Sequence, residues 1–234
     1  AQCLVGSEMC IRDRLHFCLD RRIPFLYASS ASTYGSGKNG FIEGDQCEDA
    51  LNIYAFSKLA FDRYVRQMLP EAKSQVVGLK YFNVYGPQEH HKGKMASIVY
   101  QLYNQMKSNG YVKLFKGIDG YADGEQLRDF VYVKDLVKVN LWFWKNNAPS
   151  GIYNCGTGKA HTFKAVAETI IAHFNKGRIE YIDFPEVLKG KYQNYTQADL
   201  AKLEAAGYDG GFYSLEDAVR EYCEFLDAGG YFTR

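Results

Sequence analysis

The sequence has no apolar stretch of the roughly 20 residues that a helix needs to cross a bilayer. It also has no excess of charge of one sign, because 28 lysines and arginines stand against 27 aspartates and glutamates and leave a net charge of +1. A dedicated nucleic-acid-binding domain would carry a marked basic excess. We therefore expect neither a membrane nor a nucleic acid among the partners of this protein.

The six cysteines include no C-x-x-C pair and no Cys/His cluster with the spacing of a zinc site. The start of the chain lacks the apolar core of a secretory signal, because it carries charged residues such as Glu8, Arg12 and Arg14. We expect reduced thiols and a cytoplasmic location; disulfides are the alternative, but a chain with a large core does not need them. The adjacent His90 and His91 have no third ligand at a suitable spacing, so we expect no metal.

The chain does contain an ordinary share of hydrophobic residues, 47%, together with 19 tyrosines and 15 phenylalanines. From Ile23 onward, apolar runs typical of buried strands alternate with segments of helical periodicity. This alternation predicts an α/β fold with a doubly wound parallel sheet and a smaller α/β region after Gly86. The expected strands are 23–30, 76–81, 111–115, 129–133, 151–155 and 178–183. The expected helices are 52–69, 95–107, 134–146, 162–175, 198–206 and 214–228.

Three successive segments carry residue types typical of an acid/base site. The strand expected at 23–30 ends in Ser29 and Ser30, the next helix carries Tyr54 and Lys58, and the following strand continues into Y-F-N-V-Y-G-P. Because Tyr54 and Lys58 are four residues apart, they share one face of the helix, where the ammonium favours the phenolate by charge attraction. A serine hydroxyl from the neighbouring strand end can then bind a substrate oxygen. A lone Y-x-x-x-K is usually a solvated helix face, but chance does not explain all three segments in this order.

These segments resemble the extended short-chain dehydrogenase/reductase family, the NAD(P)-dependent sugar-nucleotide epimerases and dehydratases. The resemblance implies a Rossmann-like sheet and places Ser30, Tyr54 and Lys58 at the catalytic serine, tyrosine and lysine positions. It also implies that Tyr54, Lys58 and Val84 contact the cofactor, NADP with NAD as the alternative, and that Asn83 faces the substrate. No carboxylate follows Ser30 directly, which argues against the dehydratases, because those resemble one another in an acid pair at that place.

Further segments resemble the branch of this family that inverts an exocyclic carbon, C6″, of an ADP-linked sugar by transient oxidation. They are E-H-H-K-G-K-M-A-S at 89–97, L-F at 114–115, R-D-F-V-Y-V at 128–133, N-C-G-T-G at 154–158 and K-G-K-Y-Q at 189–193. The resemblance implies a second acid/base group at Lys92, a small-molecule ADP-sugar substrate and a homo-oligomer when the chain is full length. It also implies substrate-binding roles for Ser30, Asn83, Lys94, Gln101, Phe115, Lys116, Gly117, Ile118, Arg128 and Tyr192.

Several of these residues have a plainer interpretation. Lys92 lies in a basic loop and could be a solvated surface lysine, Arg128 could form a salt bridge with Asp129 or Glu125, and Tyr192 could be a packing residue. For the whole chain, the alternatives are another nucleotide-sugar epimerase of the 4-epimerase type and a non-catalytic nucleotide-sugar-binding fragment.

A dinucleotide-binding fold begins with a G-x-x-G-x-x-G loop that lets the backbone approach the pyrophosphate at a helix N-terminus. The sequence contains no such loop. Together with the resemblance, this predicts an N-terminally truncated copy, with little activity on its own, in which a partial Rossmann-like sheet has lost its first βα units. We expect a non-native segment at 1–14, which fits no helix or strand period well, the C-terminal part of the Rossmann domain at 15–86, and a mainly substrate-binding region at 87–234. A strand and a helix near 134–175 are expected to return to the Rossmann sheet.

Overall fold

The computed structural model describes residues 2–186 and 193–230. Its contacts group into two compact units, which are described separately. The first unit contains Ala1–Phe82, Val137–Cys155 and Ala198–Gly210, and the second contains Asn83–Leu136, Gly156–Gln197 and Gly211–Arg234. In the part of the chain that the structure describes, no helix is long and apolar enough to span a membrane.

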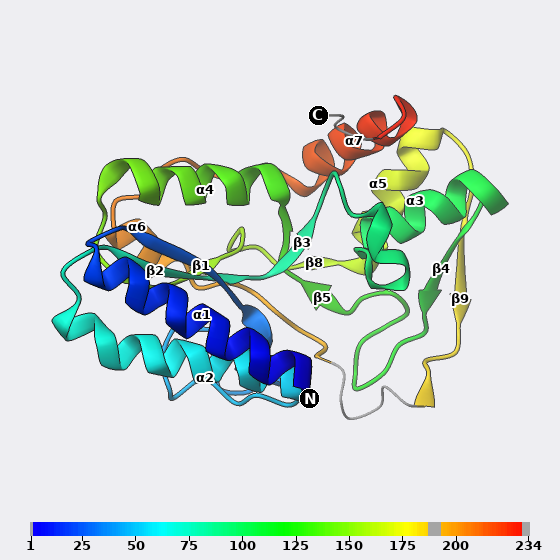
Figure 1. The fold of residues 1–234 in the computed structure, drawn as a ribbon. Coiled ribbons are helices and arrows are strands. Elements are labelled where there is room, and N and C mark those ends of the chain that lie inside the picture. Colours follow the sequence, from blue (N-terminus) through cyan, green and yellow to red (C-terminus); the bar gives the residue numbers. More distant parts are fainter. Residues whose placement is uncertain (1, 187–192, 231–234) are drawn as a thin grey trace. The chain divides into compact units, whose positions relative to one another are not determined.

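The core of the first unit is a parallel sheet with the strand order β1-β2-β7 (Figure 1). These strands are β1 (Phe25–Ser30), β2 (Val76–Tyr81) and β7 (Gly151–Cys155). The central strand, β2, is an almost continuous run of buried residues, as expected of a strand that is covered on both faces. All three strands lie where the apolar runs of the sequence predict them.

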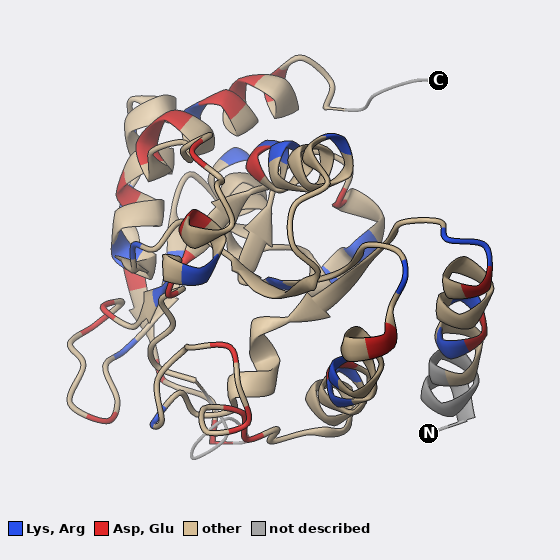
Figure 2. Cartoon of the chain, turned by 90° about the vertical axis from the view of Figure 1, so that its left-hand side faces the viewer, with Lys and Arg blue, Asp and Glu red and all other residues tan. Residues whose placement is uncertain are grey.

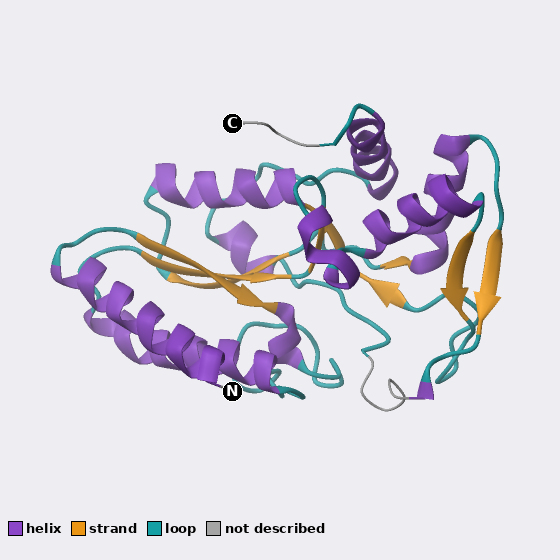
Figure 3. Cartoon of the chain, turned by 45° about the vertical axis from the view of Figure 1, so that its right-hand side comes forward, coloured by secondary structure: helices purple, strands orange, loops and turns teal. Residues whose placement is uncertain are grey.

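Helices cover both faces of this sheet (Figures 1 and 3). α1 (Gln2–Asp20) and α2 (Ile53–Met68) lie on one face, whereas α4 (Val133–Asn146) and α6 (Ala201–Ala205) lie on the other. The side chain of Asn52 caps α2 by accepting a hydrogen bond of 2.9 Å from a backbone N–H of the first turn. The predicted α/β fold with a parallel, Rossmann-like sheet is confirmed.

Residues 1–14 fit no helix or strand period well in the sequence, but the described residues of this stretch belong to α1, which continues to Asp20. Charged residues of both signs are mixed along α1, and they obscure its apolar periodicity (Figure 2). The C-terminal part of α1 packs against α2, where Leu15 is fully buried in one cluster with Phe61 and Val65. Tertiary contacts therefore stabilise a helix whose sequence pattern alone is ambiguous.

The second unit contains short pairs of strands. β3 (Asn83–Tyr85) and β6 (Phe130–Tyr132) pair in parallel, as do β4 (Val112–Phe115) and β9 (Ile179–Ile182), while β5 (Leu127–Arg128) and β8 (His161–Thr162) pair antiparallel. The sequence predicts β4, β6 and β9 but not β3, β5 and β8. Strands of two or three residues are too short to show an apolar alternation.

Three helices enclose the apolar core of the second unit, namely α3 (Ile98–Asn109), α5 (Phe163–Phe174) and α7 (Leu215–Asp227). α5 contacts both α3 and α7, so it stays in this unit. The segment that returns to the first unit therefore ends at Cys155 and does not extend to residue 175. The assignment of the two units to cofactor and substrate remains a prediction.

We expect Leu15→Ala to lower the free energy of unfolding by about 2–5 kcal/mol, because it leaves a cavity between α1 and α2. Urea denaturation measures this change, and Met9→Ala, at a position that is 64% exposed, is the control. A Leu15→Ala variant as stable as the control would show that α1 does not pack as described.

Candidate active site

Ser30 is the last residue of β1 and the N-cap of the 3-10 helix η1 (Ala31–Tyr34). Its hydroxyl oxygen accepts hydrogen bonds from the N–H of Ser32 at 3.2 Å and from the hydroxyl of Ser32 at 2.9 Å. Both bonds use the oxygen as an acceptor, so the hydroxyl proton can point toward a ligand. Ligands of α/β sheets bind at the carboxyl ends of parallel strands, and Ser30 lies at such an end.

Tyr54 and Lys58 lie in the first two turns of α2, as the sequence predicts. The Nζ of Lys58 lies 5.9 Å from the centroid of the Tyr54 ring and donates a hydrogen bond of 2.9 Å to the carbonyl oxygen of Ala28. This bond anchors the ammonium to β1, near the strand end that carries Ser30. The side chain of Tyr54 is 49% exposed, so its phenol is accessible to a bound hydroxyl group.

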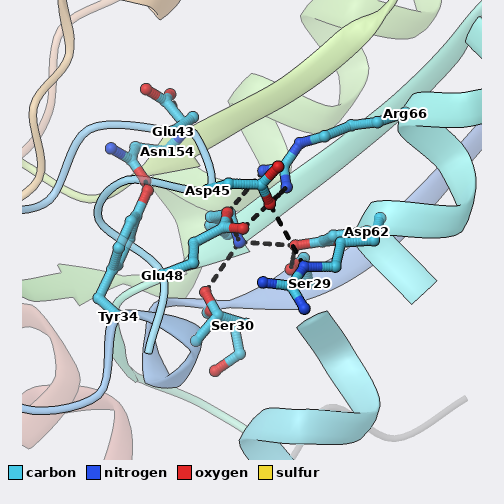
Figure 4. Close-up of polar contacts among 12 residues, drawn as sticks. Ser29, Ser30, Tyr34, Glu43, Asp45, Glu48, Asp62, Arg66 and Asn154 are labelled. Carbon is cyan, nitrogen blue, oxygen red and sulfur yellow. Dashed lines mark hydrogen bonds and ion pairs between the residues drawn. The ribbon is translucent and has the colours of Figure 1, made fainter. Parts of the chain in front are cut away.

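A lysine lies in the buried central strand, where an apolar side chain is expected. Lys80 of β2 is fully buried, and its ammonium is 2.6 Å from a carboxylate oxygen of Asp62 and 2.9 Å from one of Glu48 (Figure 4). It also donates a hydrogen bond of 2.8 Å to the hydroxyl of Thr33. Desolvating an ion costs several kcal/mol, so a buried ammonium needs pairing as complete as this.

The two carboxylates bind further donors (Figure 4). Asp62 accepts hydrogen bonds from the hydroxyls of Tyr27 at 2.8 Å and Ser29 at 2.7 Å. Glu48 accepts hydrogen bonds from both terminal nitrogens of Arg66, at 2.8 and 2.6 Å. Burial opposes the charge on Glu48, but the Arg66 guanidinium and the buried ammonium outweigh it and hold the pKa of this carboxyl below its usual range. Burial and the neighbouring Asp62 raise the pKa of Tyr27.

This buried ion network links β1, β2, α2 and the loop after η1. Ser29 precedes the candidate catalytic serine, and Asp62 lies one helical turn after Lys58, so the network fixes both elements that carry candidate catalytic groups. The sequence alone does not predict this network. The available signals were a lysine in an otherwise apolar strand and an aspartate on the buried face of a helix, both of which are rare without partners.

A second set of buried hydrogen bonds fixes β7. The side-chain oxygen of Asn154 accepts from the hydroxyl of Tyr34 at 2.6 Å, while its amide donates to the carbonyl oxygens of Phe41 at 2.6 Å and Asp199 at 3.0 Å (Figure 4). The backbone N–H of Asn154 donates to the carboxylate of Glu43 at 2.6 Å, and burial raises the pKa of that carboxyl. Asn154 therefore ties β7 to the segment that follows η1.

In the second unit, Asn83 and Val84 lie on β3 beside β6. The N–H of Asn83 donates to the carbonyl oxygen of Asp129 at 3.0 Å, and its side-chain oxygen accepts from the hydroxyl of Thr196 at 3.3 Å. Arg128 is buried, and its guanidinium donates to the carbonyl oxygen of the residue before it at 2.9 Å. The contacts of these residues with cofactor or substrate stay predictions.

Lys92 and Lys94 lie in the 3-10 segment η3 (His90–Met95), and both are exposed. Gln101, in α3, was predicted to contact the substrate. Its amide nitrogen donates to the carbonyl oxygens of Lys94 at 3.3 Å and Ala96 at 2.7 Å. Gln101 therefore holds the backbone of the lysine-bearing segment, a role that the sequence does not reveal.

Residues 115–118, which are predicted to bind the substrate, lie at the end of β4 and in the loop after it. The Phe115 ring packs edge-on against another phenylalanine, with ring centroids 5.3 Å apart. Lys116 forms an exposed ion pair of 2.8 Å with Asp183, and this hydrogen bond raises the pKa of the lysine and lowers that of the aspartate.

The structure brings Tyr54 and Lys58 together on one helix and places Ser30 in the same unit. Every other described candidate belongs to the second unit, and Tyr192 lies outside the described residues. Across residues 2–186 and 193–230, no group of three or more His, Cys, Asp or Glu side chains could hold a metal ion.

Residues 12–156 match the model of the NAD dependent epimerase/dehydratase family, and the chain therefore belongs to that family. Among solved structures, it is similar to the ADP-L-glycero-D-manno-heptose-6-epimerase of Helicobacter pylori, with 32% sequence identity and a TM-score of 0.81. The match covers 94% of this chain and 65% of that one, so the chain spans about 65% of the length of this relative.

Two 4-epimerases share the fold. One is the UDP-N-acetylglucosamine 4-epimerase of Methanobrevibacter ruminantium, with a TM-score of 0.77 and 21% identity over 91% of this chain and 66% of that one. The other is the UDP-glucose 4-epimerase of Thermus thermophilus, solved with NAD, with a TM-score of 0.72 and 24% identity over 91% of this chain and 67% of that one.

We expect Lys80→Met to lower the free energy of unfolding by about 3–5 kcal/mol, because it leaves the carboxylate of Asp62 buried without its cation and leaves Glu48 with Arg66 alone. Urea denaturation measures the change against Lys73→Met, which removes an exposed lysine of the same unit. Equal stability of the two variants would contradict the ion network.

The lowered pKa of Glu48 gives the stability of the chain a pH dependence of definite sign. The unfolded state binds a proton to this carboxyl near pH 4.3, roughly its ordinary pKa, while the folded state still resists protonation. The stabilisation is therefore complete above that pH and is lost as the pH falls further. We expect the free energy of unfolding to fall as the pH is lowered from 5 to 3, roughly the interval over which an ordinary carboxyl titrates. The fall should be less steep in Glu48→Gln, which lacks this carboxyl, than in the exposed control Glu204→Gln. Equal slopes would refute the role of Glu48.

Proposed function

We propose that this chain carries the substrate-binding and acid/base part of an ADP-L-glycero-D-manno-heptose 6-epimerase. Such an enzyme inverts C6″ of ADP-D-glycero-D-manno-heptose and supplies a precursor of the lipopolysaccharide core. The observation that carries the proposal is the similarity to the Helicobacter pylori enzyme, 32% identical over 94% of this chain. The placement of Tyr54 and Lys58 on one helix supports it, with the phenol accessible and the ammonium anchored.

The proposed reaction is a transient oxidation followed by reduction from the opposite face. Tyr54, as the phenolate, takes the proton of the C6″ hydroxyl while the hydrogen on that carbon leaves as a hydride, which gives a ketone. Ser30 donates a hydrogen bond to the same oxygen and stabilises its developing charge. After the ketone has turned its other face, the hydride returns to the carbon while Lys92 gives a proton to the oxygen, and the carbon then has the inverted configuration. Proton exchange with water restores both side chains.

The cofactor proposed for this chain is NADP, with NAD as the alternative, and it supplies the acceptor and donor of the hydride when bound. The residues present fit its nicotinamide end. Lys58 uses one N–H on Ala28, so its ammonium has further donors for ribose hydroxyls. Tyr54 and Val84 are the other proposed contacts. We also propose a cytoplasmic homo-oligomer. The thiols that the structure describes are not in disulfides, namely those of Cys10, Cys18, Cys47, Cys155 and Cys223.

Titration calorimetry with the purified chain separates this proposal from its alternatives. We expect the ADP-linked heptose to bind at least about tenfold more tightly than UDP-galactose, a difference of about 1.4 kcal/mol. Tighter binding of UDP-galactose would favour a 4-epimerase. Binding of the ADP-sugar together with failure to bind NADP or NAD would favour a non-catalytic nucleotide-sugar-binding fragment.

Tyr54→Phe tests the role of the phenol. In the slow interconversion of the two C6″ epimers that we expect of this chain with added NADP, kcat should fall by roughly 10²–10⁴-fold or to the background rate, because the base is gone, while the affinity for the ADP-sugar changes little. Tyr64→Phe, a second tyrosine on α2, is the control. Full turnover by Tyr54→Phe would remove this residue from the mechanism.

A further inference from the structure

A buried carboxylate lies at the base of the segment that carries Lys92 and Lys94. Glu89 directly precedes η3 and is only 4% exposed. Its backbone carbonyl oxygen accepts a hydrogen bond of 2.9 Å from the N–H of Lys92. Burying a carboxylate away from water is costly unless hydrogen-bond donors surround it. The donors to Glu89 therefore identify the parts of the chain that this carboxylate connects.

Those partners come from both ends of the segment and from α7. Oε1 accepts hydrogen bonds from the hydroxyl of Ser97 at 2.7 Å, the hydroxyl of Tyr222 at 3.0 Å and the N–H of Gly86 at 3.4 Å. Oε2 accepts from the N–H of Ser97 at 2.6 Å. Gly86 stands at the start of the segment, Ser97 ends it as the N-cap of α3, and Tyr222 belongs to α7. One carboxylate therefore closes the segment 86–97 into a loop and ties that loop to the core of the unit.

We propose that Glu89 is a positioning residue for Lys92. It holds the segment 86–97 closed, so that the lysine is presented from a fixed backbone. The inference rests on the proposed function, in which Lys92 is the second acid/base group. Such a group must stay within hydrogen-bond reach of the oxygen it protonates, and small displacements of a catalytic group are costly.

Two further contacts hold the same segment. The amide of Gln101 binds the carbonyl oxygens of Lys94 and Ala96 from α3. At the other end, Gly86 has a φ of +142°, and a Cβ there would lie 2.5 Å from Cγ1 of Val133, so only glycine allows this close approach. The segment is thus fixed at its start, in its middle and at its end, with Glu89 joining the start to the end.

Glutamine replaces this carboxylate only with a loss of hydrogen bonds. Each carboxylate oxygen accepts from one backbone N–H, whereas a glutamine side chain offers one oxygen and one NH₂ group. An NH₂ in place of Oε2 opposes the N–H of Ser97. An NH₂ in place of Oε1 opposes the N–H of Gly86, and the hydroxyls of Ser97 and Tyr222 must then turn from donors into acceptors. Glu89→Gln therefore removes the charge and one backbone hydrogen bond, which weakens the closure of the loop while preserving the size of the side chain.

Hydrogen–deuterium exchange tests the proposal without any need for turnover. We expect the peptide 86–97 to exchange at least about tenfold faster in Glu89→Gln than in Glu168→Gln, an exposed control with the same change in charge, while peptides from β9 are unchanged. Equal exchange of 86–97 in the two variants, or equal acceleration throughout the second unit, would overturn it.

Tyr222→Phe is the second variant, for use should Glu89→Gln fail to fold. It keeps the carboxylate and removes one hydrogen-bond donor. We expect a smaller acceleration of exchange that is confined to 86–97, and its absence would overturn the proposal.

A double variant tests whether Glu89 acts through Lys92. If it does, Glu89→Gln combined with Lys92→Met turns the substrate over no more slowly than Lys92→Met alone. A further loss in the double variant would mean that Glu89 has another role and would overturn the positioning proposal. Full turnover by Lys92→Met would instead refute the proposed function of the lysine, and the exchange result would still decide whether Glu89 closes the loop.

Discussion

The pairing of the Lys80 ammonium with Asp62 and Glu48 is the constraint on which the first unit depends. An apolar side chain in β2 would need only close packing. A buried ammonium is stable only when carboxylates lie at fixed positions around it, here on α2 and in the loop after η1. Those carboxylates in turn order Ser29 and Arg66. The ion network thereby fixes α2 relative to the end of β1. The first of these elements carries the proposed base, Tyr54, and the second carries Ser30.

The second unit uses a buried charge of opposite sign for a similar purpose. The Glu89 carboxylate accepts hydrogen bonds from neutral donors of Gly86, Ser97 and Tyr222. In the same way, the Lys80 ammonium binds several acceptors. In both places the groups proposed for chemistry, Tyr54 and Lys92, are exposed, and the group that orders their backbone is buried. Low dielectric makes an unpaired buried charge costly, so each such charge fixes its surroundings more strictly than apolar packing would.

The sequence predicts the elements with long apolar periods and the local geometry of the candidate site. α2, β2 and β7 lie where expected, and the i, i+4 spacing of Tyr54 and Lys58 is enough to place them together. α1 is missed because packing against α2, rather than its own pattern, stabilises it. The network around Lys80 is missed because its partners are distant in the sequence, and no local pattern relates residues 48, 62 and 80. Likewise, nothing in the sequence shows that Gln101 binds the backbone of the lysine-bearing segment.

We propose that this chain contributes the acid/base groups for a transient oxidation at C6″ of an ADP-linked heptose. Deuterium placed on that carbon tests this chemistry when it is followed through the slow turnover expected of the chain with NADP in ordinary water. We expect the product of inverted configuration to keep its deuterium at C6″, because the hydrogen leaves and returns as a hydride without mixing with solvent. Inversion accompanied by replacement of the deuterium with solvent hydrogen would contradict it.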